Sequence, residues 1–181
     1  MRRTVLTYGL IAGAILAASM VLALPFRESI GFDRSMVFGY TTMVIAFLMV
    51  YFGVRSYRDK VADGNVSFGR ALSVGLLITV VATACYVATW EVIYFKVTPD
   101  FDKAYAAYTI EKARQSGASE QEIAATAAEM AKFSEMYQNP FYNAAVTFLE
   151  PLPVGLLFSL IAAGTLSRRR RSVGAGAVLA Q

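Results

Sequence analysis

Four apolar runs, each long enough to cross a lipid bilayer, constrain this chain more than any other feature of its sequence. A membrane-spanning helix requires about 20 apolar residues, and it satisfies its own backbone hydrogen bonds, which lipid cannot do. Only 17% of the 181 residues are charged, whereas a soluble domain carries about 25%. We therefore predict a single domain over residues 1–181, an all-α integral membrane four-helix bundle. The predicted spans cover about residues 4–24, 35–54, 68–95 and 141–166.

The first run must be distinguished from a cleavable signal peptide. It begins with basic residues, and the small residues before Leu24 resemble a cleavage site. However, its apolar part is longer than a typical signal core. Gly9, Gly13 and Ala17 also recur every four residues, which lets another helix approach closely. We expect this run to be retained as the first span.

The distribution of basic residues predicts the orientation, because cytoplasmic loops of membrane proteins are enriched in Lys and Arg. If both termini are cytoplasmic, ten of the 17 basic residues lie close to the membrane on that side. The external segment, residues 99–139, then carries more acidic than basic residues. We therefore predict both termini in the cytoplasm. The ten residues are Arg2, Arg3, Arg55, Arg58, Lys60, Arg70, Arg168, Arg169, Arg170 and Arg171.

The four consecutive arginines, Arg168–Arg171, lie at the start of the cytoplasmic tail, residues 167–181. Such a run could contact nucleic acid. Directly after a span, however, it is typical of an anchor that binds anionic lipid heads. We expect the lipid bilayer as the partner of this run, and no nucleic acid.

The external segment between the third and fourth spans has the pattern of two helices. Apolar residues recur at helical spacing over residues 101–108, and Gly117 is a typical C-terminal cap. Ser119 and Glu122 then have the spacing of a capping box, and the Asn-Pro pair at 139–140 is typical of a helix start. We therefore predict an external helical hairpin. Its apolar faces could pack on each other and on the bundle, which we favour, lie on the membrane surface, or bind a partner.

A charged motif follows the second span. Its glycine tolerates the positive φ that a tight turn needs, and Ser67 is suited to cap the third span. The basic side chains can extend to the membrane surface. We expect a tight cytoplasmic connection, the alternative being a loop that binds a partner or a lipid head. The motif residues are Arg55, Tyr57, Arg58, Asp59, Lys60 and Gly64.

Two stretches resemble a known family. Residues 38–77 include "FGVRSYRDK" at the end of a span, a glycine turn, and "SFGRAL" at the start of the next span; residues 147–170 read "TFLEPLPVGLLFSLIAAGTLSRRR". Together they are similar to the DUF4199 family, and the resemblance covers most of the chain. It implies a bacterial inner-membrane protein with four spans, and it supplies no activity.

The residue inventory argues against the common kinds of enzyme. The chain contains no histidine and one cysteine, Cys85, so the histidine-dependent zinc and nucleophile–histidine sites are excluded. It also lacks the glycine-rich phosphate loop that precedes a Lys-Ser or Lys-Thr pair. We expect no catalytic residue, no metal and no cofactor.

The last span combines a carboxylate with two helix-breaking residues, because Pro151 and Pro153 follow Glu150. Proline cannot donate an amide hydrogen bond, so the helix should bend there. An ionisable residue at membrane depth usually faces the bundle interior. A rise of about 1.5 Å per residue places Glu91 and Tyr40 at a similar depth on the other spans. We therefore predict a kinked, inward-facing polar pocket. Its candidate residues are Glu150, Glu91, Tyr40, Thr147, Asn143, Trp90 and Tyr94.

Two interpretations of this pocket stay open. It is either a structural network, in which Glu150 pairs with a tyrosine, with Trp90 or with a basic side chain, or a site for a proton, a cation or a ligand. The structural network corresponds to a structural or accessory protein, which binds another membrane protein or itself through small-residue helix faces. The site corresponds to a small transporter or ligand-binding bundle with an outward-facing pocket around Glu150 and Glu91. The candidate basic partners are Arg27, Arg34 and Lys96.

Overall fold

The computed structural model describes residues 1–167, except for the side chains of residues 27 and 28. The predicted anchor Arg168–Arg171, and the tail apart from its first residue, lie outside the described residues. The described chain is helical throughout, with short connections. Its elements are α1 (Arg2–Ala23), the 3₁₀ turn η1 (Leu24–Phe26), α2 (Arg27–Val61), α3 (Phe68–Val92), the π-helical turn η2 (Ile93–Val97), α4 (Phe101–Gln115), α5 (Glu120–Tyr137), α6 (Pro140–Leu149) and α7 (Leu152–Leu166).

Four helical stretches in the described residues are long and apolar enough to cross a membrane. The predicted all-α bundle with four spans is thereby confirmed, and the protein is a multi-pass membrane protein. Each stretch extends beyond the predicted apolar run at one or both ends, because the helices continue into polar flanking residues. The stretches are Arg2–Phe26, Ser29–Val61, Phe68–Val97 and Pro140–Leu166.

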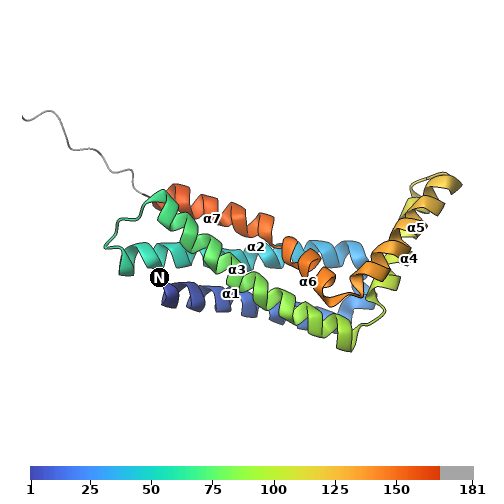
Figure 1. Cartoon of the computed structure of the whole chain (residues 1–181), viewed down its shortest axis with the longest axis horizontal. Coiled ribbons are helices and arrows are strands. Elements are labelled where there is room, and N and C mark those ends of the chain that lie inside the picture. The colour runs from blue at the N-terminus through green and yellow to red at the C-terminus, as the bar shows by residue number, and fades with distance from the viewer. Residues whose placement is uncertain (168–181) are drawn as a thin grey trace, which may run out of the picture.

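The spans run antiparallel to their neighbours in sequence, and the two ends of the bundle are different (Figure 1). The N-terminus, the α2–α3 connection and the end of α7 lie at one end, which we call the terminal end. Helices α4 and α5 project from the other end, which we call the hairpin end. We call the half of the bundle beside the terminal end the terminal half, and the half beside the hairpin end the hairpin half.

Close helix contacts dominate the terminal half. Helix α3 packs against α1, α2 and α7. A methyl group built on Gly9 would lie 2.6 Å from Cβ of Val81, and one built on Gly13 would lie 2.6 Å from Cβ of Cys85. The predicted small-residue stripe of the first span is therefore used within the chain, against α3. Gly155 of α7 meets Thr79 of α3 in the same way.

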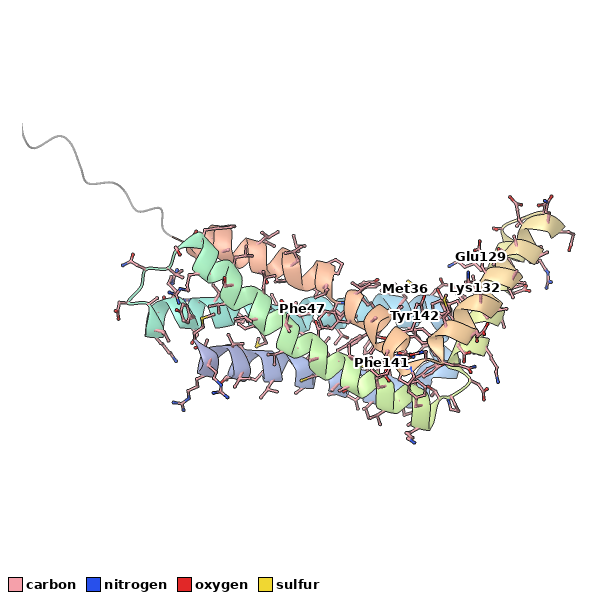
Figure 2. The ribbon with its side chains drawn as sticks, viewed as in Figure 1. Met36, Phe47, Glu129, Lys132, Phe141 and Tyr142 are labelled. Carbon is pink, nitrogen blue, oxygen red and sulfur yellow. The ribbon has the colours of Figure 1, made fainter. Side chains whose placement is uncertain are left out.

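The hydrophobic core runs between these helices. Figure 2 shows Phe47 of α2 in the middle of the bundle, and this ring is fully buried. Helix α1 contributes Val5, Ala12 and Leu16 to the same core. Burial of one face of α1 supports its retention as a span, which stays a prediction that mass spectrometry of the mature chain would test.

Three spans are interrupted toward the hairpin end. Helix α2 has a non-helical residue, Gly31, with φ 75°, a conformation that glycine adopts without steric cost. Helix α3 ends in the π-helical turn Ile93–Val97. The fourth span is divided into α6 and α7 at Glu150 and Pro151, where the two prolines predict a bend. The hairpin half is therefore less regular than the terminal half.

The predicted end signals describe the hairpin correctly. Gly117 has φ 81°, and Ser119 and Glu122 form the reciprocal capping box. Asn139 accepts hydrogen bonds from the first amides of α6, the closer one at 2.9 Å. The helical hairpin is confirmed, and it is not an irregular loop.

The motif after the second span forms the α2–α3 connection at the terminal end. Ser67 caps α3 by accepting a hydrogen bond from the Arg70 amide. Arg58 and, more distantly, Arg55 pair with Asp59. Three other motif residues have different surroundings: Tyr57 is buried, Lys60 is exposed, and Gly64 has a φ of 77°. The motif therefore builds a compact turn, as its glycine and cap predict.

Candidate functional site

A large hollow opens in the hairpin half of the bundle. Its volume is about 1130 Å³. The walls come from the second half of α1, residues 31–43 of α2, residues 86–97 of α3 and η2, and the Val146–Glu150 part of α6, with the start of α4 and the end of α5 at the rim. We call this space the hairpin-end hollow. It exists because α2 packs on α1, α3 and α7, whereas α6 packs mainly on α3 and α5.

Glu150 lies at the break between α6 and α7 and lines the hollow. The Tyr86 hydroxyl of α3 donates a hydrogen bond of 2.8 Å to its Oε2 atom. Within the described residues no protein group donates to Oε1 and no basic side chain forms an ion pair with this carboxylate. Arg34 and Lys96 are among the described residues, whereas the Arg27 side chain is not. One carboxylate oxygen therefore accepts a hydrogen bond from the protein, and the other has no partner in the described chain, although the residue is exposed and lines the hollow.

A closed chain of hydrogen bonds forms the wall beside Glu150. The Trp90 indole donates to the Tyr137 hydroxyl over 2.9 Å, which lies 3.3 Å from Thr147 Oγ1. Thr147 donates to Asn143 Oδ1 at 3.2 Å, and the Asn143 amide donates to the Tyr137 carbonyl at 3.2 Å. Because the single Thr147 hydrogen is used on Asn143, Tyr137 is the donor to Thr147. The hydroxyl and indole donors of this wall, on Trp90, Tyr137 and Thr147, are therefore each engaged with a neighbour.

The structure brings together some of the predicted pocket residues and separates others. Glu150, Thr147 and Trp90 line the hollow, and Asn143 is buried directly behind Thr147. Tyr40 is 46% exposed and does not line the hollow. Tyr40 faces away because depth along a helix, which the residue count gives, does not determine the rotation of the helix about its axis.

Glu91 and Tyr94 also lie outside the hollow wall. The Oε1 atom of Glu91 is buried and has no hydrogen-bond partner in the described part of the chain. Tyr94 is almost fully buried in η2, where its ring packs edge-to-face on Tyr137. Glu91 and Glu150 therefore occupy different surroundings, and only Glu150 belongs to the hollow.

Three residues of this region were missed by the sequence interpretation. Tyr86 binds Glu150, and Tyr137 connects Trp90 to the polar wall. Asp102 of α4 is 1% exposed and accepts a hydrogen bond from Ser134 of α5. The spacing of Tyr86, Trp90 and Tyr94, four residues apart on one face, was an available signal. No local pattern indicated that Asp102 would be buried.

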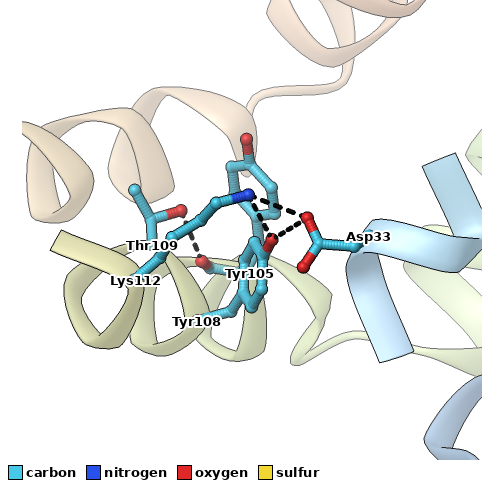
Figure 3. A network of polar contacts seen from close by, with 5 residues as sticks. All are labelled: Asp33, Tyr105, Tyr108, Thr109 and Lys112. Atoms are coloured by element: carbon cyan, nitrogen blue, oxygen red, sulfur yellow. Dashed lines mark hydrogen bonds and ion pairs between the residues drawn. The ribbon is translucent and has the colours of Figure 1, made fainter. Parts of the chain in front are cut away.

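The hairpin is attached to the start of α2 by aromatic and charged contacts. Phe32 packs against Phe101, Tyr105 and Tyr108, with ring centroids 4.9–5.9 Å apart. Figure 3 shows Asp33 accepting from the Tyr108 hydroxyl at 2.6 Å and from Lys112 at 2.8 Å. The hydrogen bonds that Lys112 donates to Asp33 and, at 2.9 Å, to the Tyr108 hydroxyl raise the pKa of Lys112. Of the three possibilities for the hairpin, the structure shows packing on the bundle.

Comparison with known proteins identifies a family. The model of a family described as "Protein of unknown function (DUF4199)" matches residues 7–168. The chain therefore belongs to the DUF4199 family, as the two stretches of the sequence predict. No curated protein and no solved structure matches the chain.

Proposed function

We propose that this member of the DUF4199 family is a ligand-binding membrane protein, and that the hairpin-end hollow holds a small amphipathic molecule. The observation that carries the proposal is Glu150, which lines a space of about 1130 Å³ with mainly apolar and aromatic walls and has one carboxylate oxygen without a partner in the described chain. Ligand sites commonly have volumes of about 300–1,000 Å³ and a few convergent polar groups. An ionisable residue at membrane depth indicates a functional site by default.

The proposal includes an orientation. The family resemblance implies a bacterial inner membrane, and the bias of basic residues favours both termini in the cytoplasm. In this orientation the hollow belongs to the outer half of the bilayer, and the ligand enters from the outer leaflet or from outside the cell. Reporter fusions at Gln181 and beside Gly117 test it, and an external C-terminus would contradict it.

Binding, or transport of what is bound, fits this chain better than catalysis. The chain has no histidine, and the polar wall beside Glu150 is closed by its own hydrogen bonds. The hollow thus offers one carboxylate without an ion-pair partner in the described chain, together with ring surfaces, which suit recognition of a molecule. We therefore propose no reaction, metal or cofactor.

A pair of glycine substitutions tests the ligand-binding function. Gly39 of α2 lines the hollow, and a methyl group built on it meets no atom within 4 Å. Gly164 of α7 has the same free space but does not line the hollow. Gly39→Phe should fill the hollow without disturbing the helix, and Gly164→Phe is the matched control.

The measurement is native mass spectrometry of the full chain purified in an uncharged detergent. We expect a bound small molecule on the wild type and on Gly164→Phe, and its loss from Gly39→Phe. Equal retention of the molecule by both variants would exclude the hollow as the binding site. A wild type that carries nothing, even after incubation with a membrane lipid extract, would contradict the ligand-binding function.

An accessory role is the second candidate, and the surface of α5 favours it. Ala124, Ala128 and Ala131 are exposed on one side of this projecting helix, and small residues allow close helix contact. Crosslinking followed by purification tests this role. A stoichiometric membrane-protein partner that is lost with Ala128→Arg and kept with Gly39→Phe would support it, and a partner kept by both variants would contradict it.

A further inference from the structure

We infer that the ligand of the hairpin-end hollow carries an ammonium group, which binds Glu150 and the aromatic rings beside it. This inference rests on the proposed function, since it names the chemistry of the molecule that the hollow would hold. It follows from three independent features: the charge of the walls, the hydrogen-bonding state of their polar groups, and the nature of the remaining surface.

The walls of the hollow are acidic. Among the described residues its lining includes two carboxylates, Asp100 and Glu150, and neither Lys nor Arg. Asp100 is paired with Lys103 at 2.7 Å, so its charge is already compensated. Glu150 has no such partner in the described chain. Glu150 is exposed at the hollow, so its charge is accessible, and a cationic ligand would supply the missing partner.

The hydrogen bonds of the wall beside Glu150 select against an anion at that position. Tyr86 donates its hydroxyl hydrogen to Glu150, and Trp90 donates its indole hydrogen to Tyr137. Thr147 uses its hydrogen on Asn143. These hydroxyl and indole donors beside Glu150 are thus consumed, while the Oε1 acceptor has no partner in the described chain. This part of the hollow can accept hydrogen bonds or balance positive charge, and it has no free donor for a phosphate or a carboxylate.

Aromatic surface surrounds the same space. Trp90 and Phe101 both line the hollow, with ring centroids 4.9 Å apart and planes at 83°, so the two rings form perpendicular walls. The Trp90 indole donates to the Tyr137 hydroxyl, so these polar atoms are already engaged. The surface that these two side chains leave for a ligand is that of their rings. Ring faces attract ammonium and alkylated ammonium groups, with Trp the strongest. A carboxylate beside such rings is a suitable receptor for this head group.

The remaining walls suit an apolar portion of the ligand. Leu16, Met20, Met43 and Val146 line the hollow on three different helices, and methionine adapts to irregular apolar shapes. The same ammonium chemistry occurs in lipid head groups and in small soluble cations. The experiment therefore includes one probe from each source.

The single tryptophan of the chain provides the readout. Trp90 is the only Trp and lines the hollow, so its fluorescence reports binding there directly. The full chain in an uncharged detergent would be titrated with dodecyltrimethylammonium, with an uncharged dodecyl ether of the same chain length, and with choline. The variants are Glu150→Gln and, as a control carboxylate on α3 outside the hollow, Glu91→Gln.

We expect saturable binding of dodecyltrimethylammonium to the wild type and to Glu91→Gln, at least about tenfold tighter than that of the ether, a factor that corresponds to about 1.4 kcal/mol. Glu150→Gln should remove this preference and leave the ether unaffected. Choline bound as tightly as the long-chain probe indicates a soluble source, and binding of the long-chain probe alone indicates a membrane source.

Equal affinity of the wild type for the ammonium and the ether would overturn the inference, and so would an undiminished ammonium preference in Glu150→Gln. If Glu150→Gln does not fold, the wild-type comparison of the two long-chain probes decides alone. The proposed function has a separate test. If the wild type binds the two long-chain probes with equal affinity and Gly39→Phe binds neither, the hollow is still a ligand site. Only the ammonium group is then rejected.

Discussion

The terminal half and the hairpin half of this bundle are built from the same four spans but have different packing. In the terminal half, glycines at helix crossings let α1 and α7 approach α3 closely, and the core is apolar. In the hairpin half the spans are interrupted, polar side chains are buried, and a hollow separates α2 from α6. The close helix contacts and the candidate site thus lie in different halves along the long axis of the bundle.

This separation has a physical cause at the breaks in the helices. A continuous fourth span would place α6 in line with α7, beside α2. The break at Glu150 and Pro151 instead lets α6 pack on α3 and α5. A site can be open in one half of a membrane protein only if the other half holds the helices together. The following predictions test this division, beginning with the largest expected effect.

The largest effect is expected from overfilling a helix crossing in the terminal half. Gly13→Leu places a branched side chain where a methyl group would already lie 2.6 Å from Cβ of Cys85. We expect a loss of about 3 kcal/mol, the upper end of what overpacking usually costs, measured as a lowered unfolding temperature in detergent. Gly39→Leu, in the open half, is the matched control and should unfold near the wild-type temperature. Equal effects of the two variants would remove the distinction between the halves.

The second prediction concerns the buried carboxylate of the hairpin. Asp102→Ala removes the acceptor of the half-buried Ser134 hydroxyl, and a hydrogen bond to a charged group contributes about 1.5–3 kcal/mol. We expect faster proteolysis near Gly117 while the spans remain protected. Asp100→Ala, at an exposed aspartate two residues earlier, should change proteolysis little. If both variants are cleaved alike, burial of Asp102 does not hold the hairpin together.

The third, smaller effect compares Tyr86, which donates a hydrogen bond to Glu150, with Tyr40, which does not. Tyr86→Phe loses the hydrogen bond to Glu150, and a net loss of about 1 kcal/mol is expected for one hydrogen bond. Tyr40→Phe removes a hydroxyl from an exposed side chain that does not line the hollow. Thermal unfolding of the two variants measures the difference. A larger effect at Tyr40 would mean that α2 is rotated relative to this structure.

The smallest effect is expected at the surface ion pair of the hairpin. Lys112→Met breaks contacts to Asp33 and Tyr108 that are largely exposed, and exposed ion pairs contribute little to stability. The pKa of Lys112 is raised in the folded protein. Its contribution is therefore fully present below the unfolded pKa of about 10.4, and it is lost only as the pH rises through the folded value.

Unfolding of the wild type and of Lys112→Met between pH 6 and 9 measures this contribution. The difference between the two proteins should be small, constant across this range, and smaller still in high salt. A difference that grows toward acidic pH would contradict this account, because acid protonates the Asp33 carboxylate and not the amine.

The sequence by itself determined the features that depend on near neighbours. Span length follows from bilayer thickness, so the four spans are recognisable from composition alone. The capping box at Ser119 and the left-handed glycine at Gly117 are formed by residues within one or two turns of each other. The break at Pro151 follows from a missing amide. Each of these needs no information about the rest of the chain.

Only the tertiary structure decided which side chains meet. Counting residues placed Tyr40, Glu91 and Glu150 at a common depth, yet Tyr86 is the partner of Glu150 and Tyr40 is exposed. Asp102 is likewise buried and hydrogen-bonded to Ser134, which lies 32 residues away along the chain. The physical reason is that helix rise sets depth, whereas rotation about the helix axis is set by packing at crossings such as that of Gly13 with Cys85. Those crossings join residues far apart in the sequence, and they determine which face of each span lines the hollow.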